Sequence, residues 1–186
     1  MIIANILGIF ILFYFLWRTL KDDYQYEKIF NLAFLILFGF IAGSTLSVYV
    51  LNDYWFWLSL SGILIGFAIA IKRQKMKLYE SFEALVIGLL PWISIVYLTN
   101  SINKSSLSSF ISFWLSSICI ALFFFFKSYY RSFTWYKSGR VGFAGVLTSA
   151  IFFLTMSVSN HEPYLSGSVA FILFLLLYKL SINKND

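Results

Sequence analysis

Residues 29–77 read IFNLAFLILFGFIAGSTLSVYVLNDYWFWLSLSGILIGFAIAIKRQKMK, and this stretch decides the fold. It holds two apolar runs, 29–51 and 54–71, which are separated by Asn52 and Asp53 and followed by a basic segment. Each run is close to the length of about 20 residues that a helix needs to cross a bilayer. Because so short a connection allows only a tight turn between antiparallel helices, the stretch predicts a transmembrane hairpin.

The same pattern continues on both sides of this hairpin. Hydrophobic residues make up 60% of the 186 residues and charged residues 12%, whereas charged residues are about 25% of an ordinary soluble protein. Further apolar runs of spanning or nearly spanning length occur at 2–18, 84–99, 107–126, 141–158 and 165–181. The sequence therefore predicts an all-α polytopic membrane protein, with seven transmembrane helices in one domain over 1–186.

The basic residues predict the orientation of these helices. Lys and Arg follow the first, third, fifth and seventh apolar runs, whereas Lys104 is the one basic residue on the other side. Because Lys and Arg concentrate in cytoplasmic loops, the N-terminus is expected outside and the C-terminus in the cytoplasm. The Ser- and Asn-rich residues 99–109 are then expected to form an outer loop. Topology and anionic headgroups explain the net charge of +6, so no nucleic-acid partner is expected.

Side chains suited to catalysis or metal binding are sparse. His161 is the only histidine and Cys119 the only cysteine, and the sequence contains no P-loop and no G-x-S-x-G elbow. We therefore predict no metal site, no cofactor and no disulfide within the chain. No ionisable residue falls at the centre of a predicted helix, which argues against a pump, an ion-coupled transporter or a charged pore.

The remaining polar groups have structural interpretations beside the functional ones. His161 with Glu162 is either a general base next to a carboxylate or, more simply, a solvated turn between helices. Glu80 and Glu83 share a helix face at the start of the fourth helix, where the helix dipole favours negative charge. Lys77 is placed to pair with Glu80, and a paired-carboxylate catalyst is the alternative interpretation.

Glycines recur at a helix-packing spacing in the central hairpin. Gly39 and Gly43 are four residues apart in its first helix, and Gly62 and Gly66 are four apart in its second. This spacing places each pair on one helix face and permits a close approach of two backbones. We interpret the four glycines as helix-packing or lipid-binding positions and expect the two helices of the hairpin to pack through them.

Two parts of the hairpin resemble the prolipoprotein diacylglyceryl transferase family. Residues 60–73, LSGILIGFAIAIKR, are similar to the family's His-Gly-Gly-Leu-Ile-Gly stretch and the basic loop after it. Residues 43–46, GSTL, resemble its Gly-Ala-Arg-Leu, and Glu83 falls where the family commonly has an Asp. The order of features is similar from about residue 6 to 181. The resemblance implies seven helices and transfer of diacylglyceryl from phosphatidylglycerol to the lipobox cysteine of a secreted prolipoprotein.

The residues that would carry this chemistry are replaced. Ser61 stands where the family has its functional His, and Thr45 stands where it has an Arg. Residues 95–100, IVYLTN, occupy the place of the family's G-R-x-G-N-F-x-N-G-E signature without Arg or Glu, and 150–154, AIFFL, lack the essential Arg of the sixth helix. Arg140 lies in a partial match to the signature, but on the cytoplasmic side and far beyond the family's spacing.

These observations favour a divergent member of the family that is degenerate in its active site and binds phospholipid acyl chains. The polar residues that we would test first for any catalysis are Ser61, Arg140 and His161. The resemblance implies phosphatidylglycerol as the phospholipid, a membrane or secreted protein as a second partner, and the bacterial cytoplasmic membrane as the location. Two alternatives remain: a non-catalytic membrane scaffold or partner subunit, and a lipid or small-molecule transporter without ion coupling.

Overall fold

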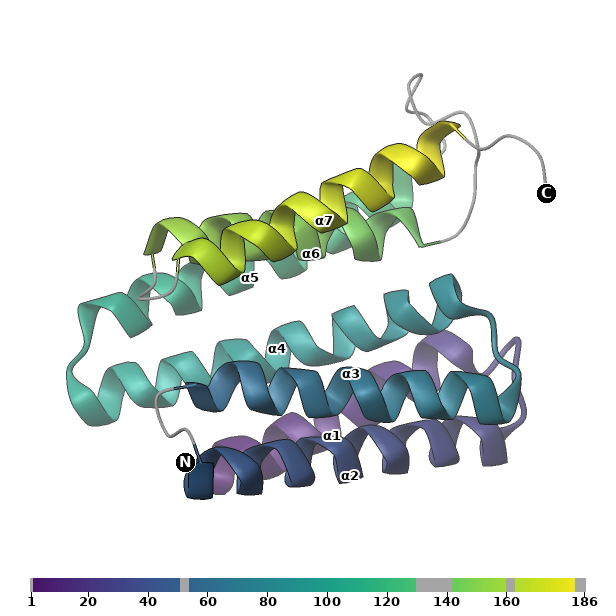
Figure 1. The fold of residues 1–186 in the computed structure, drawn as a ribbon, viewed down its shortest axis with the longest axis horizontal. Helices are drawn as coiled ribbons and strands as arrows, with labels where there is room; N and C mark the ends of the chain where they lie inside the picture. The colour runs from purple at the N-terminus through teal and green to yellow at the C-terminus, as the bar shows by residue number, and fades with distance from the viewer. Residues whose placement is uncertain (1, 51–53, 130–141, 160–162, 183–186) are drawn as a thin grey trace. The chain divides into compact units, whose positions relative to one another are not determined.

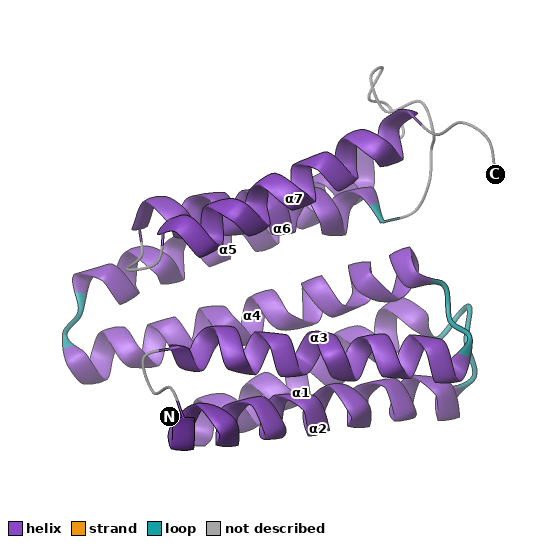
Figure 2. Ribbon diagram, in the orientation of Figure 1, coloured by secondary structure: helices purple, strands orange, loops and turns teal. Residues whose placement is uncertain are grey.

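The protein is all-helical in the part that its structure, a computed structural model, describes, namely residues 2–50, 54–129, 142–159 and 163–182 (Figures 1 and 2). Its helices are α1 Ile2–Leu20, α2 Tyr26–Val50, α3 Trp55–Gln74, α4 Leu78–Lys104, α5 Leu107–Tyr129, α6 Phe143–Ser159 and α7 Pro163–Ile182. Within these ranges, 6 helices are long and apolar enough to cross a membrane, and α6 is an apolar helix of 17 residues. The chain is a polytopic membrane protein, as its apolar runs predict.

Helix α4 differs most from its predicted bounds. Instead of covering 84–99, it extends over 27 residues from Leu78 to Lys104. The prediction of an outer loop over 99–109 is therefore wrong, since α4 and α5 enclose a break of two residues, Ser105 and Ser106. Thr99 shows why polar residues continue the helix: its hydroxyl donates to carbonyl oxygens of the preceding turn, at 3.1 and 2.9 Å. The hydroxyl of Thr99 is thus accommodated within the helix.

The internal contacts divide the chain into two compact units. We call Leu16–Ser81 the hairpin unit, because it contains α2 and α3. We call Met1–Phe15 together with Phe82–Asp186 the bundle unit, because it contains α5, α6, α7 and most of α1 and α4. That the whole chain 1–186 forms one domain stays a prediction.

In the bundle unit, α1 and α4 pack through a reciprocal pair of glycines. The indole ring of Trp92 lies against Gly8, where any side chain would overlap the ring, and Leu12 lies against Gly88 in the same way. The indole N–H of Trp92 donates to the side-chain oxygen of Asn5 at 3.2 Å. Small residues thus let large ones of the facing helix approach the backbone, which is how apolar helices gain packing energy in lipid.

Helix α6 is the most enclosed element of the bundle unit. It contacts α5 and α7, and the three helices lie together in Figure 1. Most of its side chains are buried, so protein rather than lipid surrounds much of this short helix. Helix α7 begins at Pro163, where the missing N–H costs no helical hydrogen bond.

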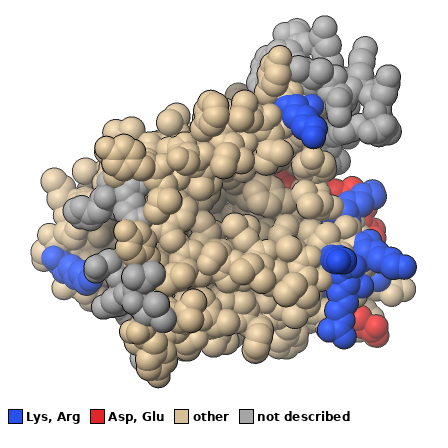
Figure 3. All heavy atoms as spheres, viewed as in Figure 1, with Lys and Arg blue, Asp and Glu red and all other residues tan. Residues whose placement is uncertain are grey.

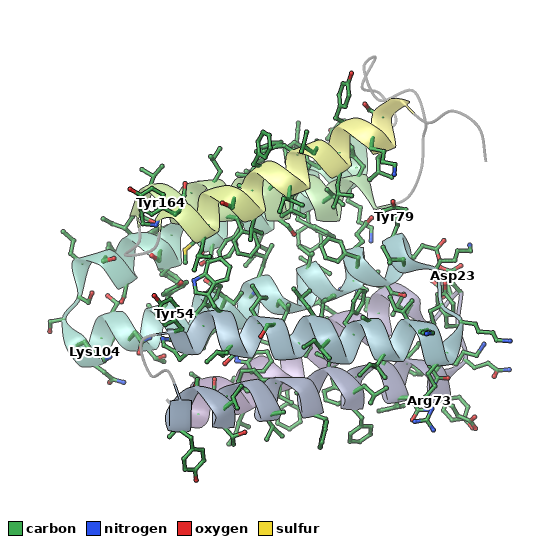
Figure 4. All side chains as sticks on the ribbon, viewed as in Figure 1. Asp23, Tyr54, Arg73, Tyr79, Lys104 and Tyr164 are labelled. Carbon is green, nitrogen blue, oxygen red and sulfur yellow. The ribbon has the colours of Figure 1, made fainter. Side chains whose placement is uncertain are left out.

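In the hairpin unit, basic side chains gather at the end away from the α2–α3 turn (Figure 3). Figure 4 shows Tyr54 at the turn end of α3, and Asp23 and Arg73 at the opposite end. Within the bundle unit, Lys104 ends α4 just before the start of α5, whereas Lys127 lies in the last turn of α5. In both units the basic residues are therefore segregated along the helices, as the predicted topology requires.

Candidate functional site

The four glycines of the hairpin form a backbone-to-backbone contact between α2 and α3. A β-carbon on Gly39 would meet the carbonyl oxygen of Gly62, and a β-carbon on Gly62 would meet that of Gly39. One turn to either side, Gly43 faces the carbonyl of Leu58 and Gly66 faces the carbonyl of Leu35. This is the close helix packing that their four-residue spacing predicts, and it leaves no room for a side chain at any of these positions.

Serine hydroxyls support the same contact nearer the turn. The hydroxyl oxygens of Ser44 on α2 and Ser59 on α3 lie 3.0 Å apart and share a hydrogen bond. The hydroxyl of Ser47, which is also buried, donates to the carbonyl of Ser44 at 2.7 Å. The bond of Ser47 lies within α2, so Ser44–Ser59 is the one that joins the two helices. A hydrogen bond between membrane helices is worth about 1 kcal/mol or less on average, so this one specifies the register of the hairpin more than it stabilises it.

The two positions that the sequence resemblance aligns with active-site residues of the transferase family carry hydroxyls bonded within their own helices. Ser61 is exposed, and its hydroxyl donates to the carbonyl of Leu58 at 2.9 Å. Thr45 is also exposed, and its hydroxyl donates to carbonyl oxygens one turn earlier in α2, at 2.7 and 2.9 Å. A hydroxyl becomes a nucleophile when a base accepts its proton, whereas these protons are directed at main-chain carbonyls.

The bundle unit contains a buried carboxylate that links three helices. Glu83, in the second turn of α4, is 5% exposed. One of its oxygens accepts a hydrogen bond of 2.9 Å from the main-chain N–H of Gly142, immediately before α6, and the other lies 3.5 Å from the ammonium of Lys127 on α5. Gly145 also packs against the backbone of Glu83. The carboxylate thus satisfies a donor at the start of α6, where negative charge is favoured.

The backbone of Gly142, whose N–H donates to Glu83, has a conformation that favours glycine. Its φ angle is 106°, a conformation that residues with a β-carbon rarely adopt. The helix-dipole interpretation of Glu83 is therefore incomplete, because its carboxylate also caps a different helix. Sequence inspection missed the link, since the spacing of Glu83 from Lys127 and Gly142 shows no local pattern. The available signal was an acidic residue followed directly by a long apolar run.

A second polar cluster ties together the two connections at the basic end of the hairpin unit. Lys77 pairs with Glu80 at 2.9 Å, which confirms the predicted ion pair. Tyr24, from the α1–α2 connection, donates its hydroxyl to Glu80 at 2.9 Å and accepts the main-chain N–H of Lys77 at 3.0 Å. Burial, together with Glu80, raises the pKa of Tyr24, and Glu80 raises the pKa of Lys77. Tyr24 therefore remains a donor at neutral pH, and the cluster has a structural role.

The other two candidates for catalysis, Arg140 and His161, lie outside the described residues. Of the three catalytic candidates, Ser61 on α3 is the one that the structure describes. Among the residues that are described, no group of three or more His, Cys, Asp and Glu side chains could hold a metal ion. Comparisons of the chain with protein families, with characterised proteins and with solved structures find no match.

Proposed function

We propose that this protein binds phospholipid in a bacterial cytoplasmic membrane and is a divergent relative of the diacylglyceryl transferases that has lost the transfer reaction. The observation that carries the proposal is the state of Ser61 and Thr45. Each replaces a charged or basic group of the family, and each directs its hydroxyl at a carbonyl of its own helix. Neither side chain is available to bind a phosphate or to take a proton from a thiol.

The chemistry of the reaction explains why these two positions matter. Releasing glycerol phosphate from phosphatidylglycerol develops negative charge on the phosphate, and this charge requires nearby cations. Alkylation of the cysteine also requires a base that removes the proton of the thiol. In the predicted topology the outer side holds one Lys or Arg, Lys104, which lies at the end of α4 (Figure 4). In this proposal the protein keeps the hairpin that resembles the transferase family but lacks the cations and the base that the reaction requires.

Lipid contact is supported by the side chains that α2 presents. Phe30, Phe34, Phe38 and Ile41 are all exposed, and their spacing of three or four residues puts them along one side of the helix. A row of large apolar side chains on a membrane helix is a surface for acyl chains. Tyr54 and Trp55 are exposed at the start of α3, where amphipathic rings suit the headgroup region.

The test is a lipid-transfer assay with purified protein, phosphatidylglycerol and a lipobox peptide, combined with complementation of a transferase-depleted bacterium. We expect no transfer above the protein-free rate and no complementation, while phospholipid copurifies with the protein. A single transition-state contact of this kind is worth about 2.7–4 kcal/mol, and several are missing, although such losses do not simply add.

An active transferase of the family, expressed at the same level, is the positive control. Robust transfer that persists in Lys104→Ala and His161→Ala variants would contradict the proposal and would mean that another group performs the chemistry. Absence of both transfer and bound phospholipid would favour the scaffold or partner-subunit alternative.

A further inference from the structure

A groove of about 360 Å³ lies along α2 near the basic end of the hairpin. Its wall on α2 consists of Asn31, Phe34, Leu35 and Phe38, and its end is formed by Arg73 and Gln74 in the last turn of α3. All of these residues belong to the hairpin unit. The residues on α2 are spaced by three and four positions, so they form one continuous helix face.

The groove is apolar along α2 and polar at its basic end. Phe34 and Phe38 are 62% and 72% exposed, so their rings are open to a long hydrocarbon chain. The other lining residues include Arg73, which carries a guanidinium, and Asn31 and Gln74, which carry amides. An Arg fork matches the oxygens of a phosphate, and amide N–H groups add further donors. A long apolar part ending in a cationic, donor-rich part has the chemistry of a site for one anionic phospholipid.

The antiparallel packing of the hairpin keeps this end favourable for an anion. The C-terminus of α3 carries partial negative charge, which would repel a phosphate. However, the N-terminal part of α2, which carries the opposite partial charge, lies at the same end. The contact of Gly66 with the carbonyl of Leu35 holds the two backbones together beside the groove. The opposite partial charges of the two helix ends therefore largely offset each other, and the positive charges of Lys72 and Arg73 can attract an anion there.

Arg73 also has a simpler interpretation, which must be separated from lipid binding. A basic residue in the last turn of a helix stabilises the exposed carbonyls there. Lys72 shares this position, since both residues lie in the last turn of α3, but Lys72 does not line the groove. The two side chains thus form a matched pair, equal in charge and helix position and different in their relation to the groove.

We propose that this groove binds one anionic phospholipid of the cytoplasmic leaflet, with its phosphate on Arg73 and an acyl chain across Phe34 and Phe38. The proposal rests on the proposed function, that the protein binds phospholipid, and adds the site and the headgroup class. The predicted topology places the basic end of the hairpin in the cytoplasm, where anionic lipid headgroups attract Lys and Arg. The lipid is held by its acyl chain and its headgroup charge together and needs no reaction at the site.

The test is native mass spectrometry of the full chain in detergent, titrated separately with phosphatidylglycerol and with phosphatidylcholine of the same acyl chains. We expect the wild type to prefer phosphatidylglycerol. Arg73→Gln should weaken binding of phosphatidylglycerol about tenfold, since a hydrogen-bonded charge pair is lost. It should weaken binding of phosphatidylcholine less, because the choline ammonium beside the same phosphate already opposes the charge of Arg73. Lys72→Gln should keep the wild-type preference. Free glycerol phosphate should not compete, because it lacks the acyl chain.

The outcomes separate the site from the proposed function. If the wild type prefers phosphatidylglycerol but Arg73→Gln retains that preference, or Lys72→Gln loses it equally, the groove is not the site, although the protein still binds phospholipid. Competition by free glycerol phosphate would show a phosphate site rather than a lipid site and would overturn the inference. If the wild type retains neither lipid, the proposed function itself fails. Melting curves of both variants provide the control for folding.

Discussion

Replacing Gly62 with leucine is expected to lower the melting temperature of the protein in detergent strongly. A side chain at this position would collide with the carbonyl oxygen of Gly39, and main-chain atoms cannot rotate aside as a side chain can. Overpacking of a core costs about 1–3 kcal/mol and occasionally more. We expect the upper part of this range, because α2 and α3 must separate along the whole glycine contact.

A pair of alanine substitutions gives the matched control for this prediction. Gly62→Ala should also lower the melting temperature, since its β-carbon alone meets the facing carbonyl. At Gly167 on α7 a β-carbon would find Ser157 at 3.9 Å, an ordinary contact, and alanine is the better helix former. Gly167→Ala should therefore leave stability unchanged or raise it. An unchanged melting temperature for Gly62→Leu would show that α2 and α3 do not pack through the glycine contact.

The second large effect is expected at Glu83. Glu83→Ala removes the acceptor of the Gly142 N–H and the ion-pair partner of Lys127. An unsatisfied buried donor costs about 1–3 kcal/mol, and we expect a loss of stability of that size. Loss of the ion pair should add little to this loss of stability, because the side chain of Lys127 is 44% exposed and water screens its charge.

A glutamine at position 83 separates the hydrogen bond from the charge. Glu83→Gln keeps an oxygen that accepts the N–H of Gly142 but removes the charge facing Lys127. We expect this variant to retain most of the stability that Glu83→Ala loses, as measured by thermal unfolding in the same detergent. If alanine at this position left the melting temperature unchanged, the carboxylate would not be what holds the start of α6.

Helix number and type follow from the sequence because the length and apolarity of a membrane helix are local properties. The hairpin of α2 and α3 and its glycine spacing could be predicted without knowledge of the other helices. Helix length beyond the apolar run could not be predicted in the same way. Helix α4 continues to Lys104 through a polar segment in which the hydroxyl of Thr99 bonds to its own helix, whereas composition alone favours a loop there.

Contacts between distant segments could not be predicted, since they depend on which helix lies opposite and in which register. The sequence identifies Gly8 as small, but only the fold places the ring of Trp92 against it. The groove could not be predicted for the same reason: Asn31 and Arg73 line it together only because of the register in which α2 and α3 pack. From the resemblance, the sequence predicts that Ser61 and Thr45 replace a His and an Arg of the transferase family. The direction of the two hydroxyls became known only from their hydrogen bonds in the structure.

All assignments to the cytoplasmic or outer side depend on seven crossings with the N-terminus outside, and cysteine labelling in intact cells tests this most directly. Cys119 is replaced by alanine, and single cysteines are introduced by Asn103→Cys at the end of α4 and by Lys75→Cys after α3, both at exposed positions. An impermeant thiol reagent should label the Asn103→Cys variant in intact cells and the Lys75→Cys variant only after permeabilisation. Labelling of the Lys75→Cys variant in intact cells would contradict the topology and the placement of the lipid site in the cytoplasmic leaflet.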